Sequence, residues 1–382
     1  MSTAGRTASE STDAASDLAA AVSDASFVRV VAHADGDALA AGGMLARVLS
    51  DVDRPFQVSL ARTRGAVARR VDTDAEATTV VLGAHAPEAD AVVDGPTAAS
   101  VVAFDAAREL GVDPDPTLAL AGVVAHGTLP GADGTEHVLD AARDAGVERR
   151  AGVGIPTADI ADGLAHTTLA HASFSGDAGA TQATLAELDL PVDLDESAHR
   201  TVASLFALDA TGGDQQARAA DAVERALHPH ALPDGPFATV EGYADVLDAV
   251  ARWEAGTGIA LALGHDVRTA ALDAWREHAT AAHQAVRTAD LARYSGVVVA
   301  RVPNAPVWTV ARLLRDFRSP EPVALAVSDG EAAAAGPTDV DVASLLAAGT
   351  DDDRVGGTGG RAYARFDQEQ DEEFVDAVRE AA

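Results

Sequence analysis

Short apolar runs alternate with stretches of helical periodicity over the first half of the chain. The helical stretches include residues 38–49 and 136–145. Strands that alternate with helices favour a parallel, doubly wound α/β sheet covered on both faces. The run at 118–125 is apolar enough to be either a strand or a buried helix. The predicted strands cover residues 27–32, 56–60, 78–82 and 100–104.

The pattern changes in the second half, where Ala-rich helical periodicity dominates residues 193–292 and only 258–263 is strand-like. A second, smaller α/β unit follows, with strands at 296–302 and 322–328 and a helix at 307–317 between them. We therefore predict two α/β lobes joined by a helical connector. The predicted segments are a flexible polar leader (1–26), a first α/β domain (27–192), the connector (193–292), a second α/β domain (293–368) and an acidic helical tail (369–382).

The net charge does not alter the predicted fold, but it indicates the salt concentration in which the protein works. The 382 residues include 60 acidic and 28 basic side chains, which gives a formal net charge of −32. Since 47% of the residues are hydrophobic, we expect a folded protein with an acidic surface. No Lys occurs, and a Lys-free, Ala-rich, acidic composition is typical of proteins in molar salt, where the Debye length is about 3 Å. We expect an extremely halophilic source, so the net charge says little about partners.

The composition also excludes several classes of site. The absence of Cys rules out disulfides, thiolate metal sites and a cysteine nucleophile. Residues 1–26 are rich in Ser, Thr, Ala and Asp and resemble neither a signal peptide nor a membrane anchor. No window approaches the roughly 18 uninterrupted apolar residues that a membrane span needs. We expect a cytoplasmic protein with no membrane partner.

The first candidate site follows the first predicted strand. That strand leads directly into His33-Ala34-Asp35-Gly36-Asp37, at the edge of the sheet where open α/β folds bind ligands. One imidazole and two carboxylates at alternating positions suit a borderline divalent ion such as Mn²⁺. The alternative is an acidic N-cap cluster, with Asp37 satisfying helix N–H groups.

A resemblance to a known family bears on this choice. Residues 30–40 (VVAHADGDALA) resemble motif I, His-x-Asp-x-Asp, of the DHH phosphoesterase superfamily. The similarity covers most of the chain and includes residues 152–159 (GVGIPTAD) and 173–177 (SFSGD). Within the superfamily the chain resembles archaeal RecJ-like proteins, which include nucleases associated with the GINS replication complex. The resemblance implies a DHH domain followed by a smaller DHH-associated domain of the DHHA1 type.

The same resemblance implies a damaged active site. Active members use two Mn²⁺ ions to activate water for attack on a phosphodiester. Here Gly83 stands where motif II has Asp, and motif III (Asp-His-His) reads Asp105-Ala106-Ala107. Motif IV reads Gly127-Thr128, and Thr358 replaces the His of the C-terminal glycine motif. We therefore expect two-metal catalysis to be lost, with one manganese ion or none retained. The vestigial candidate ligands are His33, Asp35, Asp37 and Asp105.

Two histidines keep an alternative open. His85 and His126 lie near predicted strand ends, beside the motif II and motif IV positions, and could replace lost metal ligands with a different geometry. The other interpretation is that both are ordinary loop histidines.

Candidate nucleic-acid contacts lie in the second lobe. Guanidinium groups suit phosphate, and a glycine-rich loop can present backbone N–H groups to one. The alternative is that the arginines pair with the abundant carboxylates around them. The candidate residues are Arg312, Arg315, Gly356, Gly357, Gly359, Gly360 and Arg361.

The function implied by the resemblance is that of a catalytically degenerate RecJ-like protein in DNA replication or repair, serving as a nucleic-acid-binding or scaffold subunit. Its implied partners are single-stranded nucleic acid and either the GINS complex or an active RecJ-like paralogue. One alternative is an active Mn²⁺-dependent exonuclease on single-stranded DNA or RNA. Another is a phosphoesterase that hydrolyses a dinucleotide or oligoribonucleotide.

Overall fold

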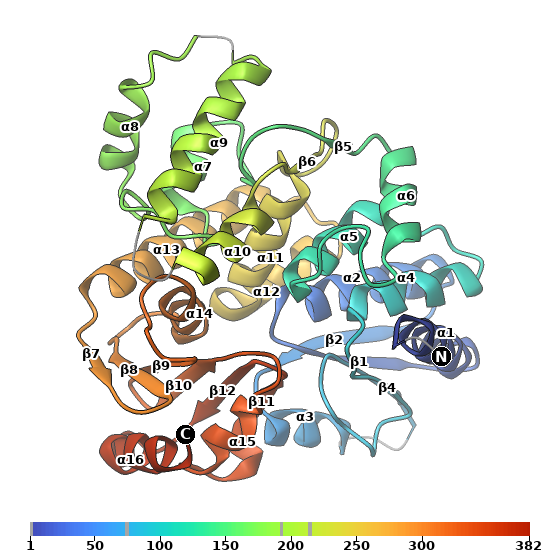
Figure 1. Ribbon diagram of the computed structural model, residues 1–382. Helices are drawn as coiled ribbons and strands as arrows, with labels where there is room; N and C mark the ends of the chain where they lie inside the picture. The colour runs from blue at the N-terminus through green and yellow to red at the C-terminus, as the bar shows by residue number, and fades with distance from the viewer. Residues whose placement is uncertain (1–2, 73–75, 192–193, 213–215) are drawn as a thin grey trace. The chain divides into compact units, whose positions relative to one another are not determined.

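The structure is a computed structural model, and its described residues form two compact units (Figure 1). Each unit is built from two segments of the chain: Met1–Glu148 with His230–Ala274 in unit 1, and Arg149–Pro229 with Trp275–Ala382 in unit 2. In the part of the chain that the structure describes, no helix has both the length and the hydropathy needed to cross a bilayer. The described residues are 3–72, 76–191, 194–212 and 216–382.

Unit 1 contains a four-stranded parallel sheet with the strand order β2-β1-β3-β4. Side chains of the central strand alternate between its faces. Val30 and Ala32 lie against Gly42 of helix α2 (Gly36–Asp51), whereas Val31 packs in a cluster with Val67 of α3 (Arg64–Val71). Helices therefore cover both faces, which confirms the predicted doubly wound sheet. The strands are β1 (Val28–His33), β2 (Phe56–Ala61), β3 (Thr78–Leu82) and β4 (Ala91–Val93).

Two strand predictions in unit 1 are wrong. Residues 100–104 belong to helix α4 (Ala99–Glu109), and 258–263 lies largely in helix α12 (Ala255–Ala262). The run at 118–125 is the buried-helix alternative, α5 (Pro116–His126). Each run is apolar because much of its helix is buried, and periodicity alone cannot distinguish such a helix from a buried strand. Two further unit 1 helices are α6 (Glu136–Asp144) and α11 (Val240–Trp253).

The expected flexible leader is also corrected. Residues Thr3–Ser23 form helix α1, which packs against α4. Ala15, Leu18 and Val22 recur at helical spacing and are buried. The polar composition hid this stripe, because small Ala side chains supply much of the apolar face.

Unit 2 contains a mixed sheet with the order β11-β12-β10-β9-β8-β7, in which only β8 and β9 are parallel neighbours. One apolar cluster packs Ala300 and Ala324 against α14 (Val307–Phe317), and a second packs Val299 and Leu325 against the C-terminal helices. The expected smaller α/β lobe is confirmed, including its helix at 307–317. The strands are β7 (Leu291–Arg293), β8 (Val297–Arg301), β9 (Val323–Ser328), β10 (Glu331–Ala335), β11 (Val355–Thr358) and β12 (Arg361–Arg365).

The expected connector (193–292) lies only partly in unit 2. That connector is helical over most of its described length, but its helices are divided between the two units. Helix α13 (Arg268–Thr288) begins in unit 1 and continues in unit 2. The other helices of unit 2 are α7 (Ile160–His166), α8 (Ala178–Ala186), α9 (Glu196–Ala210), α10 (Gln216–Ala226), α14 (Val307–Phe317), α15 (Val342–Ala347) and α16 (Asp371–Ala381).

Candidate functional site

Motif I (His33, Asp35 and Asp37) lies where β1 ends and α2 begins. Asp35 is the N-cap of α2, and its Oδ1 accepts a hydrogen bond from Ala38 N at 2.8 Å. Its Oδ2 lies 2.6 Å from His33 Nδ1. Although burial acts in the opposite direction, the hydrogen bond from His33 and the positive charges of His33 and Arg252 lower the pKa of Asp35 to about 2.

The Asp37 carboxylate is the N-terminal cap of a different helix. Its Oδ1 and Oδ2 accept hydrogen bonds from Ser100 N at 2.9 Å and Ala99 N at 2.7 Å, the first residues of α4. The N-cap position of α4, Ala98, has no side-chain acceptor of its own. Asp37 thus satisfies N–H groups that would otherwise be buried without a partner, at the positive end of the helix dipole.

His126, at the end of α5, completes this arrangement. Its Nδ1 lies 3.3 Å from Asp37 Oδ2, and its Nε2 lies 3.2 Å from Pro96 O. Burial acts against protonation, yet the interaction with Asp37 raises the pKa of His126. The structure therefore brings His126 to motif I as a partner of Asp37.

Helix α11 supplies two residues that the sequence analysis missed. Asp248 Oδ1 accepts a hydrogen bond from Gly36 N, in the middle of motif I, at 3.0 Å. Arg252 lies one turn further along α11, with Nη1 2.5 Å from Asp248 Oδ2. Despite burial, the charge of Arg252 lowers the pKa of Asp248. The i,i+4 spacing of the two residues predicts a helical ion pair, but not that the pair meets motif I.

The motif II position also lies beside motif I. A Cβ atom placed on Gly83 would lie 3.3 Å from His33 Cβ and 4.0 Å from Asp35 Oδ2. Gly83 has a φ of +72°, in the left-handed region that favours glycine. Gly83 thus lies beside His33 and Asp35 but contributes no carboxylate.

Asp105 lies in a different environment. It belongs to α4, and its Oδ1 is 2.9 Å from His137 Nε2 of α6. Both residues line a cavity of about 590 Å³, together with residues of α1 such as Ser11. The hydrogen bond to Asp105 raises the pKa of His137. Asp105 is therefore engaged with α6 instead of completing a group with motif I.

His85 is exposed and bound to a neighbouring carboxylate. Its Nδ1 lies 2.7 Å from Asp94 Oδ2. Among the residues that the structure describes, no three His, Asp or Glu side chains come together as they would around a metal ion. The candidate metal ligands of the sequence analysis are thus held in separate pairs and caps.

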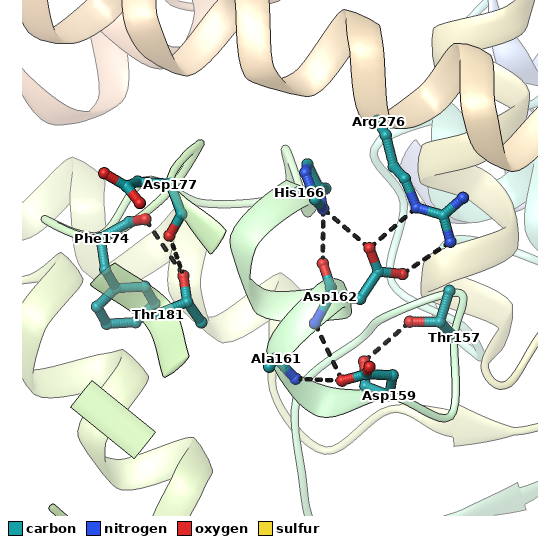
Figure 2. Close-up of polar contacts among 9 residues, drawn as sticks. All are labelled: Thr157, Asp159, Ala161, Asp162, His166, Phe174, Asp177, Thr181 and Arg276. Carbon is teal, nitrogen blue, oxygen red and sulfur yellow. Dashed lines mark hydrogen bonds and ion pairs between the residues drawn. The ribbon is translucent and has the colours of Figure 1, made fainter. Parts of the chain in front are cut away.

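In unit 2, the segments that carried the resemblance beyond motif I supply helix caps, and an ion-pair network lies beside them (Figure 2). Asp159 caps α7, and Asp177 caps α8. Arg276 of α13 binds both oxygens of Asp162, at 2.9 and 3.0 Å, and His166 Nδ1 lies 3.1 Å from Asp162 Oδ1 (Figure 2). This network connects α7 to α13, and we infer that it stabilises unit 2.

The candidate arginines of α14 also have partners within unit 2. Arg312 Nη2 donates to Thr168 O at 2.5 Å, and Arg315 Nη1 lies 3.0 Å from Asp316 Oδ1. Arg361 begins β12, half-buried at the end of a hairpin. The structure thus favours the alternative interpretation for Arg315, in which arginines pair with nearby carboxylates.

The C-terminal glycines belong to the β11–β12 hairpin. A Cβ on Gly357 would approach Arg361 O to 2.5 Å, and one on Gly360 would approach Gly336 O to the same distance. Gly359, at the turn, has a φ of +59°. Gly356 pairs with Tyr363 across the two strands. Close backbone packing therefore accounts for Gly357 and Gly360, and the turn conformation accounts for Gly359.

Comparisons with known proteins show which family the chain belongs to. A family model described as "Uncharacterized protein rrnAC1427, C-terminal domain" matches residues 289–380. The uncharacterized protein rrnAC1427 of Haloarcula marismortui is 50% identical over 386 residues, which cover 100% of both chains.

Among solved structures, CDC45 from Entamoeba histolytica superposes with a TM-score of 0.57 and 8% identity over 98% of each chain. RecJ from Thermus thermophilus, in complex with Mg²⁺, gives a TM-score of 0.47 and 17% identity over 97% of this chain. The chain spans about half of that RecJ, 52% of its length.

The fold and the motif I region define an α/β protein with the fold of CDC45. Within that class, the chain belongs to the family of the Haloarcula marismortui protein rrnAC1427.

Proposed function

We propose that this chain is a catalytically inactive, RecJ-like protein of the DHH superfamily that acts as a scaffold in DNA replication or repair. The observation that carries the proposal is the Asp37 carboxylate, whose two oxygens cap α4 instead of facing a metal ion. A carboxylate held in this way keeps the helices of unit 1 together and has little remaining capacity for catalysis.

The residues present do not fit a pair of metal ions. The two Asp35 oxygens are engaged with Ala38 N and His33, and the Asp37 oxygens with Ala99 N and Ser100 N. Two close cations need bridging carboxylates, and Gly83 provides none beside Asp35. A metal ion bound to these oxygens would compete with the backbone N–H groups for the carboxylate charge and weaken those hydrogen bonds. No hydrolytic step is therefore assigned to motif I.

The fold supports the scaffold role only by analogy. The chain has the fold of CDC45, and its RecJ-like resemblance implies either GINS or an active RecJ-like paralogue as its partner. Single-stranded nucleic acid is a second proposed partner, through Arg312, Arg315, Arg361 and the glycine hairpin. The first two arginines already have partners in unit 2, so protein binding is the stronger part of the proposal.

A cleavage assay tests the loss of activity. The full chain is incubated in molar KCl with Mn²⁺ and labelled single-stranded DNA, single-stranded RNA or dinucleotides, beside an active RecJ-like nuclease. We expect no cleavage above that of an Asp35→Asn, Asp37→Asn double variant. Mn²⁺-dependent cleavage that the double variant lacks would overturn the proposal and support the exonuclease or, for dinucleotides alone, the phosphoesterase.

A binding assay tests the scaffold role. Purified GINS and an active RecJ-like paralogue are each passed over the immobilised chain in molar KCl. We expect one of them to be retained and to co-elute with the chain as a stable complex in size-exclusion chromatography. Failure of both to bind would contradict the scaffold role even if the chain is inactive.

A further inference from the structure

Helix α11 packs closely on motif I. A Cβ on Gly36 would lie 2.8 Å from Ala125 Cβ and 3.0 Å from Asp248 N, so only glycine allows this approach without a shift. The contact is fixed by the hydrogen bond from Gly36 N to Asp248 Oδ1. Asp248 therefore becomes a third carboxylate at motif I, beside Asp35 and Asp37.

Two of these carboxylates, Asp35 and Asp248, repel each other and therefore need positive charge nearby. Burial makes an uncompensated carboxylate costly, and repulsion between carboxylates adds to that cost. His33 and His126 supply positive charge only when protonated. An arginine is charged at every relevant pH, and Arg252 is the arginine whose charge acts on both Asp35 and Asp248.

Arg252 is held firmly in this position. Its side chain is only 9% exposed, and its Nη1 lies 2.5 Å from Asp248 Oδ2 and 3.1 Å from Asp248 O. Its own carbonyl accepts a hydrogen bond from Arg62 Nη2. A buried guanidinium with these partners loses little conformational freedom when it neutralises a carboxylate.

We propose that the Arg252 guanidinium is the resident cation of motif I, where it balances the charge of Asp35 and Asp248 and so excludes a divalent metal ion. The inference rests on the proposed loss of catalysis, and it names Arg252 as the group that balances the carboxylate charge in place of a metal ion. A dication approaching Asp35 would be repelled by a fixed positive charge in a poorly solvated region. Removal of that charge should open motif I to a metal ion.

The test compares Arg252→Met, which removes the charge, with Arg252→Lys, which keeps it. Arg47→Met is the matched control, because Arg47 forms an ion pair with Asp115 in the same unit but none with motif I. Bound Mn²⁺ is measured by electron paramagnetic resonance in molar KCl, and the thermal midpoint is measured with and without Mn²⁺.

We expect Arg252→Met to unfold at a lower temperature than the wild type, to bind Mn²⁺, and to regain stability when it does. Adding Asp35→Asn to this variant should abolish both Mn²⁺ responses. The wild type, Arg252→Lys and Arg47→Met should show only weak, unsaturated Mn²⁺ binding to the acidic surface and no gain in stability from it. A folded Arg252→Met variant that gives no more Mn²⁺ response than Arg47→Met would overturn the inference, as would wild-type binding that depends on Asp35.

A double-mutant cycle covers the case in which Arg252→Met does not fold. If Arg252 balances the charge of Asp248, then Asp248→Asn combined with Arg252→Met should be more stable than Arg252→Met alone. Equal instability of the two variants would contradict the inference. The cleavage assay decides separately whether the wild type is inactive, so an inactive wild type with no coupling refutes this inference alone.

Discussion

Asp37, near the start of α2, accepts a hydrogen bond at 2.9 Å from the backbone N–H of Ser100, which lies 63 residues further along the chain. This contact ties two helices of unit 1 together through a carboxylate that the DHH resemblance would assign to metal binding. The cap accounts for the position and hydrogen bonds of Asp37 without a metal ion. It also gives the residue a role that can be measured in the absence of any metal.

We expect Asp37→Ala to lower the free energy of unfolding by about 2 kcal/mol, because two buried N–H groups of α4 lose a charged acceptor. Asp177→Ala, which removes an exposed cap of α8, is the control and should cost about half as much. The measurement is chemical unfolding in molar KCl, with and without Mn²⁺. An effect of Asp37→Ala that appears only with Mn²⁺ would identify Asp37 as a metal ligand instead.

Restoration of the motif II carboxylate should not restore activity. Gly83→Asp forces a side chain into a backbone with a φ of +72°, 3.0 Å from Ala38 Cβ. We expect a loss of about 1–2 kcal/mol in unfolding free energy and no Mn²⁺-dependent cleavage. Gly95→Asp is the control, since no atom lies within 4 Å of its Cβ position. Cleavage by Gly83→Asp would show that a missing carboxylate was the main defect.

The stability of unit 2 should depend on pH through His171. Burial, together with the charges of Arg287 and Arg318, lowers the pKa of His171 from 6.5 to about 4. Between pH 6.5 and 4, His171 is therefore protonated in the unfolded chain and neutral in the folded chain. The free energy of unfolding has its full value above pH 6.5 and falls as the pH drops toward 4. The expected loss is about 1–3 kcal/mol.

The variant His171→Gln should flatten this pH dependence, and His265→Gln, on an exposed histidine, should not. The ring of His283 stacks on that of His171, and their Nδ1 atoms are 2.9 Å apart. Burial lowers the pKa of His283 as well, so His283 adds to the loss of stability at low pH. Unfolding in guanidinium chloride at pH 7.5, 6 and 5 measures the slope. An unchanged slope for His171→Gln would show that His171 does not titrate in this range.

The ion pair between Arg276 and Asp162 should depend on its two-point geometry (Figure 2). Arg276→Lys keeps the charge but loses one of the two hydrogen bonds, and we expect a cost of about 1 kcal/mol, since both side chains are partly exposed and screened. Arg143→Lys, in an exposed pair with Asp140, should leave stability unchanged. Equal effects of the two changes would mean that the network in Figure 2 contributes no more than a surface pair.

The sequence predicts the strands of the two sheets well where a short run is rich in apolar residues. The runs at 27–32, 78–82 and 322–328 each form the expected strand, because each lies in a buried position between helices. The run at 100–104 forms a helix whose first turn is capped by Asp37, a tertiary contact that local periodicity cannot reveal. The stripe of α1 was missed because Ala dominates it.

The candidate site shows the same division between local and distant effects. The alternative interpretation of motif I, an acidic cap cluster, correctly anticipated that Asp37 satisfies helix N–H groups. That these belong to α4 could not be predicted, because it depends on tertiary packing. Asp248 and Arg252 were missed for the same reason: their spacing marks a helical pair, and only the close approach of α11 at Gly36 brings them to motif I.

The central claim is that motif I serves as a structural cap and not as a metal site. Titration of the wild-type chain with Mn²⁺ in molar KCl, followed by electron paramagnetic resonance, tests it most directly against the Asp35→Asn, Asp37→Asn double variant. The account predicts the same weak, unsaturated binding to the acidic surface in both proteins. Saturable binding to the wild type that disappears in the double variant would contradict it.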